Sequence, residues 1–147
     1  MPTKVSRARK KPASLKDSAS MAGRIAKALA VLSSDLPNPF DESTDYFRPF
    51  SAPFPVDSPI NEATLRTALK ISGRYKLDIT DLGNLGEGYG EPEESSFRVL
   101  QCVMSATLRE IKLVFARAPG VVRVRTWILG RTPTGDLAGL RTETTET

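Results

Sequence analysis

The amino-acid sequence predicts one layered domain of the α/β (α+β) class that ends in an antiparallel hairpin. Its length of 147 residues is typical of a single domain. Apolar residues recur at helical spacing in some segments and alternate with polar residues in others, so helices and strands are expected to follow one another. Near the end, T-P-T-G at 132–135 has a proline and a glycine where a type I turn prefers them, between two strand-like segments.

Composition excludes several classes of protein. With 39% hydrophobic and 26% charged residues, the chain resembles an ordinary globular protein. No apolar stretch approaches the roughly 18 to 20 residues that span a bilayer, so no membrane association is expected. The sequence has no histidine and one cysteine, Cys102, which excludes an internal disulfide, Ser/His and Cys/His nucleophile pairs and most zinc sites. We therefore expect a protein that is not an enzyme and has no cofactor of its own.

Charge divides the chain into two parts. Residues 1–27 hold eight basic residues and one acidic residue, a net charge of +7, whereas residues 28–147 hold 13 basic and 16 acidic residues, a net charge of −3. Few large apolar side chains occur in residues 1–18, which predicts a disordered basic arm before a single domain at 19–147. We expect an intracellular, cytoplasmic protein, and the arm leaves a nuclear or mitochondrial destination open. The arm holds a candidate patch for nuclear import or for polyphosphate, with a solvated tail as the alternative: Arg7, Arg9, Lys10 and Lys11.

The first half of the domain predicts two helices and two strands. Ser20 is the candidate N-cap of the first helix. The apolar stripe of this helix is Met21, Ile25, Leu29 and Leu32. Prolines among aromatic residues favour an edge strand at 46–50, and Ser58 before a proline favours a helix at 59–72 that Gly73 ends. Alternation then predicts a half-buried strand at 75–80.

The second half predicts one long helix and a hairpin. An apolar stripe at helical spacing favours a central packing helix over 96–118: Phe97, Leu100, Met104, Leu108, Ile111, Phe115 and Ala118. Alternating residues predict a strand at 122–129, and a returning strand follows the turn at 132–135. The order is helix, strand, helix, strand, helix, strand, strand. Because the final T-E-T-T-E-T is short-chained and polar, we expect the C-terminus to project from the sheet.

Other candidate sites favour a structural interpretation. Neighbouring carboxylates such as Glu93 and Glu94 are more typical of a solvated surface than of general acid and base catalysis. Arg123 and Arg125, with Trp127 two residues on, form a candidate stacking surface for single-stranded nucleic acid. A solvated strand face, or arginine stems that cover apolar surface, is the favoured interpretation of the same pattern. Direct nucleic-acid binding is therefore not expected.

The last segment of the chain, 127–147, carries a more specific motif. It resembles the C-terminus of the nuclease A inhibitor (NuiA-like) family of sugar-non-specific nuclease inhibitors, which end in a pattern like G-x-T-x-x-G-N-L-A-G-φ-x-T-x-x-V-E-T. The chain departs from this pattern at Asp136, where Asn is usual, and at Thr145, where Val is usual. The residues that it keeps are Gly130, Thr132, Gly135, Leu137, Ala138, Gly139, Thr142, Glu146 and Thr147. The segment D-E-S-T-D-Y-F-R-P-F at 41–50 is similar to the family's S-E-S-[DE]-Y-P-φ-x-φ-F segment, and the order of elements agrees over about residues 25–147.

The resemblance implies a three-layer α-β-α sandwich that inhibits a metal-dependent, sugar-non-specific DNA/RNA endonuclease of the ββα-metal type. In that family the last threonine reaches the nuclease's catalytic Mg²⁺, and a glutamate of the S-E-S segment joins the contact. The matching residues here are Thr147, with Glu146 before it, and Glu42. The family also uses an aromatic residue in the loop before the long helix, and Tyr89 is the nearest match, with Tyr in place of Trp. The implied partner is a nuclease, and we expect a monomer.

Two alternatives belong to other classes. A NuiA-like scaffold can act as a non-catalytic interaction module with a different partner, and Thr145 and Tyr89 are substitutions expected in that case. A nucleic-acid binder that uses the basic arm is the third class, and its binding would depend steeply on salt.

Overall fold

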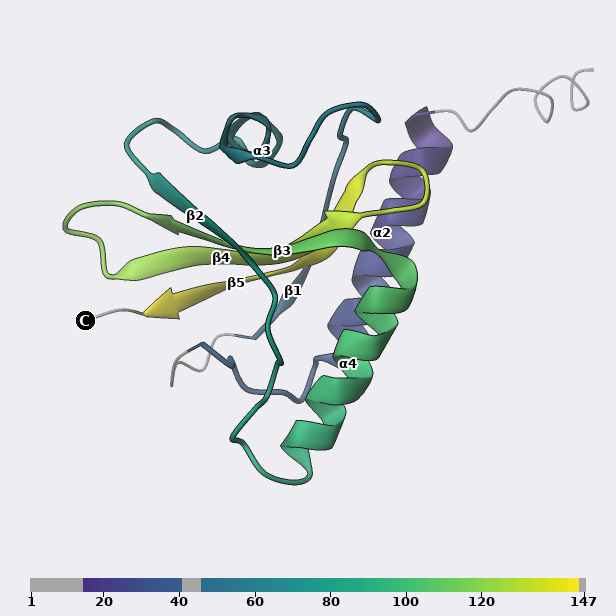
Figure 1. The fold of residues 1–147 in the computed structure, drawn as a ribbon, viewed down its shortest axis with the longest axis vertical. Coiled ribbons are helices and arrows are strands. Elements are labelled where there is room, and N and C mark those ends of the chain that lie inside the picture. Colours follow the sequence, from purple (N-terminus) through teal and green to yellow (C-terminus); the bar gives the residue numbers. More distant parts are fainter. Residues whose placement is uncertain (1–14, 41–45, 146–147) are drawn as a thin grey trace, which may run out of the picture.

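A computed structural model describes residues 15–40 and 46–145. These residues form three helices and one antiparallel sheet of five strands in the order β1-β5-β4-β3-β2 (Figure 1). The predicted mixed class and the C-terminal antiparallel hairpin are confirmed. The elements are α2 (Leu15–Leu32), β1 (Arg48–Ala52), α3 (Glu62–Leu69), β2 (Lys76–Asp81), α4 (Glu93–Thr107), β3 (Arg109–Arg117), β4 (Arg123–Arg131) and β5 (Leu137–Thr145).

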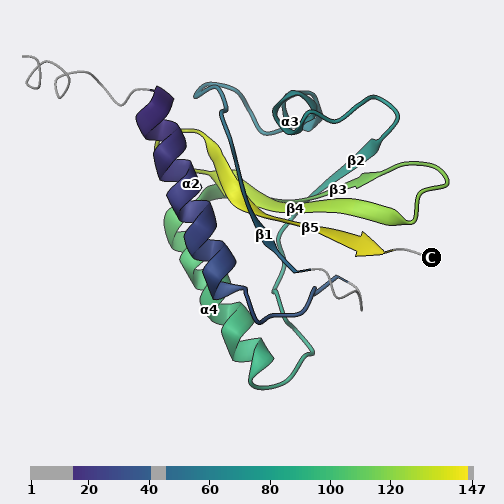
Figure 2. The same cartoon turned by 180° about the vertical axis from the view of Figure 1, so that it is seen from behind.

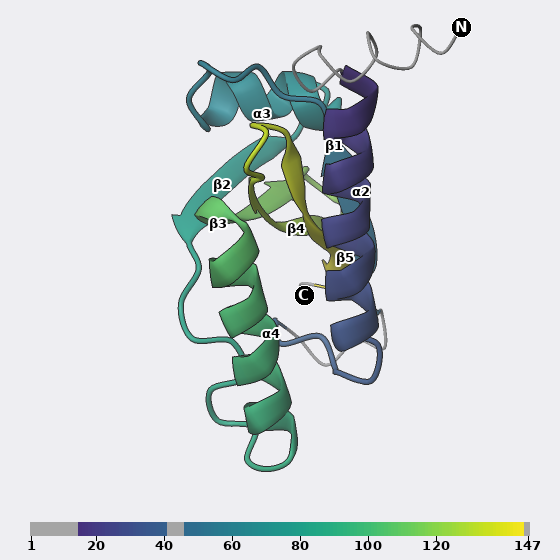
Figure 3. The same cartoon turned by 90° about the vertical axis from the view of Figure 1, so that its right-hand side faces the viewer.

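Apolar side chains pack on both faces of this sheet. On one face, Ile128, Ala138 and Leu140 form a cluster with residues of α2 and α4, which lie side by side in Figure 3. On the other face, a second cluster joins Trp127, Leu129 and Leu137 of the hairpin to Leu65 and Leu69 of α3. The β4–β5 hairpin contributes to both clusters, because successive side chains of a strand point to opposite faces. The hairpin is therefore the centre of the fold.

The helix predicted over 96–118 is wrong in its second half. Helix α4 ends at Thr107, and Leu108 is already extended, with φ −127° and ψ 152°. Residues 109–117 form β3, in which Val114 and Ala116 face the α3 cluster while Leu113 packs on the other side. Because apolar residues face both sides of this inner strand, its sequence shows no simple alternation. The helical spacing of Leu108, Ile111 and Phe115 is therefore coincidental.

Two other helix boundaries differ from the predictions. Helix α2 begins at Leu15 and not after Ser20, and Ala22 and Ala26 are buried beside Leu29, while Leu32 is 39% exposed. The alanines form the inner face because small side chains let the helix lie close to its neighbours. Helix α3 starts after Asn61, whose side chain and that of Thr64 form a reciprocal capping box with hydrogen bonds of 3.0 Å.

The end of α3 also differs. The residue after the helix is Lys70, in the left-handed conformation with φ 56°, and not Gly73. A left-handed residue ends a helix because its geometry turns the chain out of the helical path, and Lys70 takes the place where glycine is usual.

The edge strand predicted at 46–50 is present two residues later, as β1. It pairs with β5 along the sheet edge nearest α2 (Figure 2). Pro49 lies within this strand, which an edge position tolerates because one side of the strand makes no ladder bonds.

The predicted projection of the C-terminal segment is wrong as far as Thr145. Strand β5 pairs with β4 over its whole length, and Thr145 lies opposite Arg123. Thr144 is buried at 3% exposure, and the Thr126 hydroxyl donates to its Oγ1 at 3.1 Å. Cross-strand threonine pairs stabilise sheets, so a polar segment remains in the interior.

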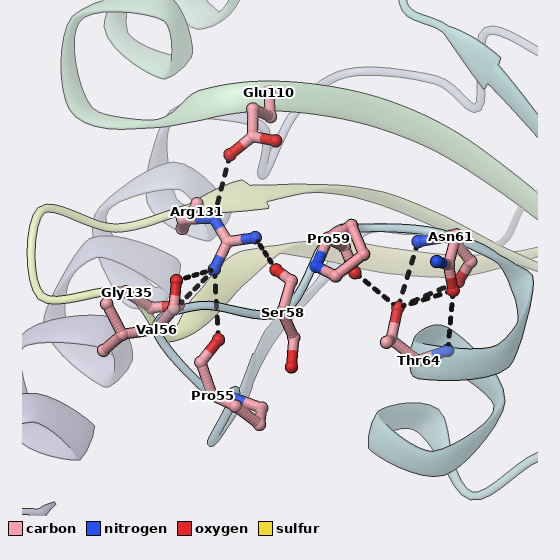
Figure 4. Close-up of polar contacts among 9 residues, drawn as sticks. All are labelled: Pro55, Val56, Ser58, Pro59, Asn61, Thr64, Glu110, Arg131 and Gly135. Carbon is pink, nitrogen blue, oxygen red and sulfur yellow. Dashed lines mark hydrogen bonds and ion pairs between the residues drawn. The ribbon is translucent and has the colours of Figure 1, made fainter.

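Hydrogen bonds from Arg131 of β4 hold the segment between β1 and α3 against the hairpin (Figure 4). Its side chain is 6% exposed, and its Nε donates to Glu110 at 2.9 Å. The remaining guanidinium nitrogens donate to main-chain carbonyls of Pro55 at 3.3 Å, Val56 at 3.3 Å and Gly135 at 3.4 Å, and to that of Ser58. One buried cation thus satisfies several carbonyl groups of a segment that has no ladder bonds of its own.

Candidate functional site

The residues predicted at the nuclease contact fall in two places. Glu42, Glu146 and Thr147 lie outside the residues that the structure describes, as does the arm patch of Arg7, Arg9, Lys10 and Lys11. Tyr89 lies within them, in the loop before α4, and is 39% exposed. The place of the predicted nuclease contact is therefore defined by Tyr89 and by the described residues next to 41–45 and 146–147.

Asn38 connects the segment that leads to Glu42 with the end of β5. Its side chain is buried, with 1% exposure. The Nδ2 atom donates to the carbonyl of Glu143 at 3.1 Å and lies 3.5 Å from Oγ1 of Thr144. Its Oδ1 accepts a hydrogen bond from the backbone N–H of Phe40 at 2.9 Å, which turns the chain toward residues 41–45.

Tyr89 joins the same place from the third segment. Its hydroxyl donates to the Asn38 carbonyl at 2.9 Å, and its ring packs on Phe97 of α4 with centroids 5.3 Å apart. We call Asn38, Phe40, Tyr89, Glu143 and Thr144 the Asn38 junction. The junction brings together the loop that holds Tyr89, the approach to Glu42 and the strand that leads to Thr147.

A hollow of about 210 Å³ lies beside this junction. Glu143 belongs to both, because its carbonyl meets Asn38 while its side chain lines the hollow. Tyr46, the first described residue after 41–45, lies at the hollow together with residues of strands β1, β4 and β5. The lining residues are Tyr46, Arg48, Arg125, Trp127, Arg141, Thr142 and Glu143. We call this hollow the arginine pocket.

The lining of the arginine pocket includes Arg125 and Trp127, two of the three residues of the candidate stacking surface for nucleic acid. Trp127 is 4% exposed, and the Arg125 guanidinium carbon lies 5.1 Å from the centroid of its ring. The tryptophan is therefore the floor of the pocket and not an open stacking platform. The interpretation that arginine stems cover apolar surface fits Arg125 and its neighbours.

Most matched residues of the C-terminal motif serve the hairpin. Gly135 donates its N–H to the Thr132 carbonyl at 2.9 Å, which closes the predicted turn. A Cβ on Gly139 would lie 1.9 Å from the carbonyl oxygen of Ile128, so only glycine fits between these strands. At the variant position, Asp136 accepts a hydrogen bond from Phe54 N–H at 3.1 Å, a bond that the amide oxygen of Asn would accept equally.

Three residues of this region carry no functional signal in the sequence. Asn38 lies between two prolines. The prolines predict the end of a helix, and no pattern in the sequence marks the asparagine between them as functional. Arg141 and Arg48 meet Arg125 only through strand pairing of distant segments. The available signal for them was their alternation on a strand, which does not specify the partner strand.

Several carboxylates outside the junction have local partners. A hydrogen bond from Lys112, at 2.6 Å, lowers the pKa of the Asp81 carboxyl. The Ser95 hydroxyl donates to Glu91 and lowers the pKa of that carboxyl. Across residues 15–40 and 46–145, no three His, Cys, Asp or Glu side chains gather as metal ligands, and none of the helices there is long and apolar enough to cross a bilayer.

Comparisons with known proteins add no family to these observations. The sequence matches none of the protein-family models searched, and a search of curated proteins finds no match.

Proposed function

We propose that this protein is a non-catalytic inhibitor of a metal-dependent, sugar-non-specific endonuclease. In this proposal the domain has the three-layer α-β-α sandwich of the NuiA-like family, and its C-terminal Thr147 ligates the Mg²⁺ of the nuclease. Glu42 joins the same contact, and Glu146 and Tyr89 touch the nuclease beside it. The motif at 130–147 is the sequence feature that supports the proposal.

The observation that carries the proposal is the Asn38 junction. Phe40 precedes Glu42 by two residues, and Thr144 precedes Thr147 by three. Two and three residues span at most about 7 and 11 Å. Since Asn38 bonds to Phe40 and to the end of β5, both proposed ligands start from one buried side chain. Tyr89 is tied to the same residue by its hydroxyl.

The chemistry of the chain end suits this role. Mg²⁺ prefers hard oxygen donors, and a terminal threonine supplies a carboxylate and a hydroxyl. The net charge of −3 over residues 28–147 also suits a cleft built to attract phosphates, because an acidic surface is steered toward it as the substrate is.

A second candidate function has its own supporting observation. The matched residues from Gly130 to Gly139 close a turn, fill the core or allow strands to approach, so any protein with this hairpin would keep them. A NuiA-like scaffold that acts as an interaction module with a different partner is thus the alternative. The two candidates differ in the need for Thr147 and for metal.

The experiment is a titration of this protein against a metal-dependent non-specific nuclease of the same organism, with plasmid DNA as substrate. We expect the full chain to inhibit. Deletion of Thr147, or addition of two glycines after it, should weaken inhibition at least tenfold, because a lost or displaced ligand costs more than about 1.4 kcal/mol.

Glu42→Ala should weaken inhibition by less than the deletion does. Asp57→Ala is its matched control, since this exposed carboxylate lies in the segment fastened by Arg131, far along the hairpin from the Asn38 junction, and inhibition should be unchanged. Inhibition that survives the Thr147 deletion unchanged would refute the metal contact. If no such nuclease is inhibited, capture from lysate with and without EDTA, read by mass spectrometry, tests the scaffold alternative.

A further inference from the structure

The arginine pocket places like charges opposite one another. Arg48 of β1 lies directly opposite Arg141 of β5. Arg125 of β4 lies opposite Glu143 and is therefore diagonal to Arg141. These side chains lie on the face of the sheet that also holds Trp127. Like charges directly opposite in a sheet are destabilising. The pocket therefore concentrates positive charge at a cost to the fold.

No acidic side chain among the described residues forms an ion pair with this cluster. In the described part of the chain, Arg48, Arg125 and Arg141 have no ion pair, whereas Arg66, Arg98, Lys112, Arg117 and Arg131 each have at least one. The one acidic lining residue, Glu143, lies 2.7 Å from Arg123 Nη2, outside the lining of the pocket. Within residues 15–40 and 46–145, these three guanidinium groups thus share one hollow without a carboxylate paired to any of them.

Aromatic rings hold part of this cluster in place. The Arg125 guanidinium carbon lies 5.1 Å from the Trp127 ring centroid and 6.0 Å from that of Tyr75. Contacts between a cation and the face of an aromatic ring are favourable, so Arg125 is preorganised. At the rim, Tyr46 is 64% exposed and presents a ring to solvent.

We propose that the arginine pocket binds the phosphate group of a nucleotide, either free or within a single strand, with the adjoining base against Tyr46. Guanidinium groups match phosphate oxygens with paired hydrogen bonds, and three of them suit the three free oxygens of a terminal phosphate, whereas a phosphodiester and a carboxylate each offer two. At about 210 Å³ the hollow is smaller than drug-sized sites of about 300–1,000 Å³, so it holds one phosphate group and little more.

This site goes beyond nuclease inhibition and is tested without a nuclease. Trp127 is the only tryptophan of the chain, so its fluorescence reports directly on the pocket. The probes are inorganic phosphate, adenosine 5′-monophosphate, an oligo(dT) of about 12 nucleotides, and poly-glutamate as an acidic peptide. We expect a saturable fluorescence change with the phosphate compounds and none with poly-glutamate.

Variants separate the pocket from the basic arm, which is kept in all of them. Arg141→Gln should weaken binding at least tenfold, whereas Arg24→Gln, the same change on an exposed residue of α2, should leave it within twofold. Glu143→Gln should strengthen binding, because it removes the negative charge of the lining. Arg141→Gln should also keep or raise the thermal midpoint, since it relieves the Arg48–Arg141 repulsion.

The ligand series distinguishes the two sources of phosphate. Equal affinity for the monophosphate and the oligonucleotide assigns the pocket to free nucleotides, and at least tenfold tighter oligonucleotide binding that Arg141→Gln abolishes assigns it to a strand. The proposal is overturned if no phosphate compound gives a saturable change, if Arg141→Gln has no effect, or if poly-glutamate binds as tightly as the phosphates.

Discussion

Asn38 is the residue on which three segments depend. Its buried side chain donates to the end of β5 and accepts from Phe40, and its carbonyl accepts from Tyr89. Loss of the side chain leaves the Glu143 carbonyl and the Phe40 N–H without these partners, which costs about 1–3 kcal/mol. We expect Asn38→Ala to lower the free energy of unfolding by that amount, measured by urea denaturation.

A control and an isosteric variant sharpen this test. Ser34→Ala removes an exposed hydroxyl that bonds to Val31 and should change stability by less than about 0.5 kcal/mol. Asn38→Asp keeps the acceptor but loses the donors, so it should cost at least as much as Asn38→Ala. A cost below half a kilocalorie for both Asn38 variants would show that the junction does not hold the segments together.

The close approach of strand β4, and not the backbone conformation, requires a glycine at position 139. Its missing Cβ would lie 1.9 Å from the Ile128 oxygen, an atom of the neighbouring strand that cannot rotate away. Gly139→Ala should therefore destabilise the protein by about 3 kcal/mol or more. The same substitution at Gly23 of α2, where a Cβ meets nothing within 4 Å, should stabilise by up to about 1 kcal/mol. Thermal denaturation measures both, and equal effects would contradict the strand register.

At the scale of elements, β3 is the place where the structure differs from the sequence-based prediction, which put these residues in a helix. Residues 109–117 lie between β2 and β4, with Val114 opposite both Ile79 and Trp127. We expect strand-type Cα chemical shifts for these residues and cross-strand nuclear Overhauser effects between Val114 and Trp127. Helical shifts that continue through Phe115 would instead support one long helix over 96–118.

Local signals account for the elements that the sequence predicted well. The turn at 132–135 and the alternation on either side specify the hairpin without reference to the rest of the chain. By contrast, β3 is covered on both faces, so its apolar residues satisfy helical and strand spacing alike. The Asn38 junction could not be predicted, because a hydrogen bond between residues 38 and 143 leaves no local pattern.

At the scale of the whole molecule, the basic arm and the domain are expected to be separate in stability. Residues 1–14, the part of the arm that precedes α2, contain one large aliphatic residue, Val5, and can bury little apolar surface. Their removal should shift the thermal midpoint by no more than about 2 °C, measured by calorimetry. A fall of about ten degrees would show that the arm packs on the domain.

The central claim is that Glu42 and Thr147 meet one metal centre of a partner nuclease. A double-mutant cycle of Glu42→Ala and the Thr147 deletion, with nuclease affinity as the readout, tests it most directly. Two groups that contact one metal are coupled, so the loss in the double variant should differ from the sum of the single losses by more than about 0.5 kcal/mol. Losses that add within about 0.3 kcal/mol would place the two residues at independent contacts and contradict the claim.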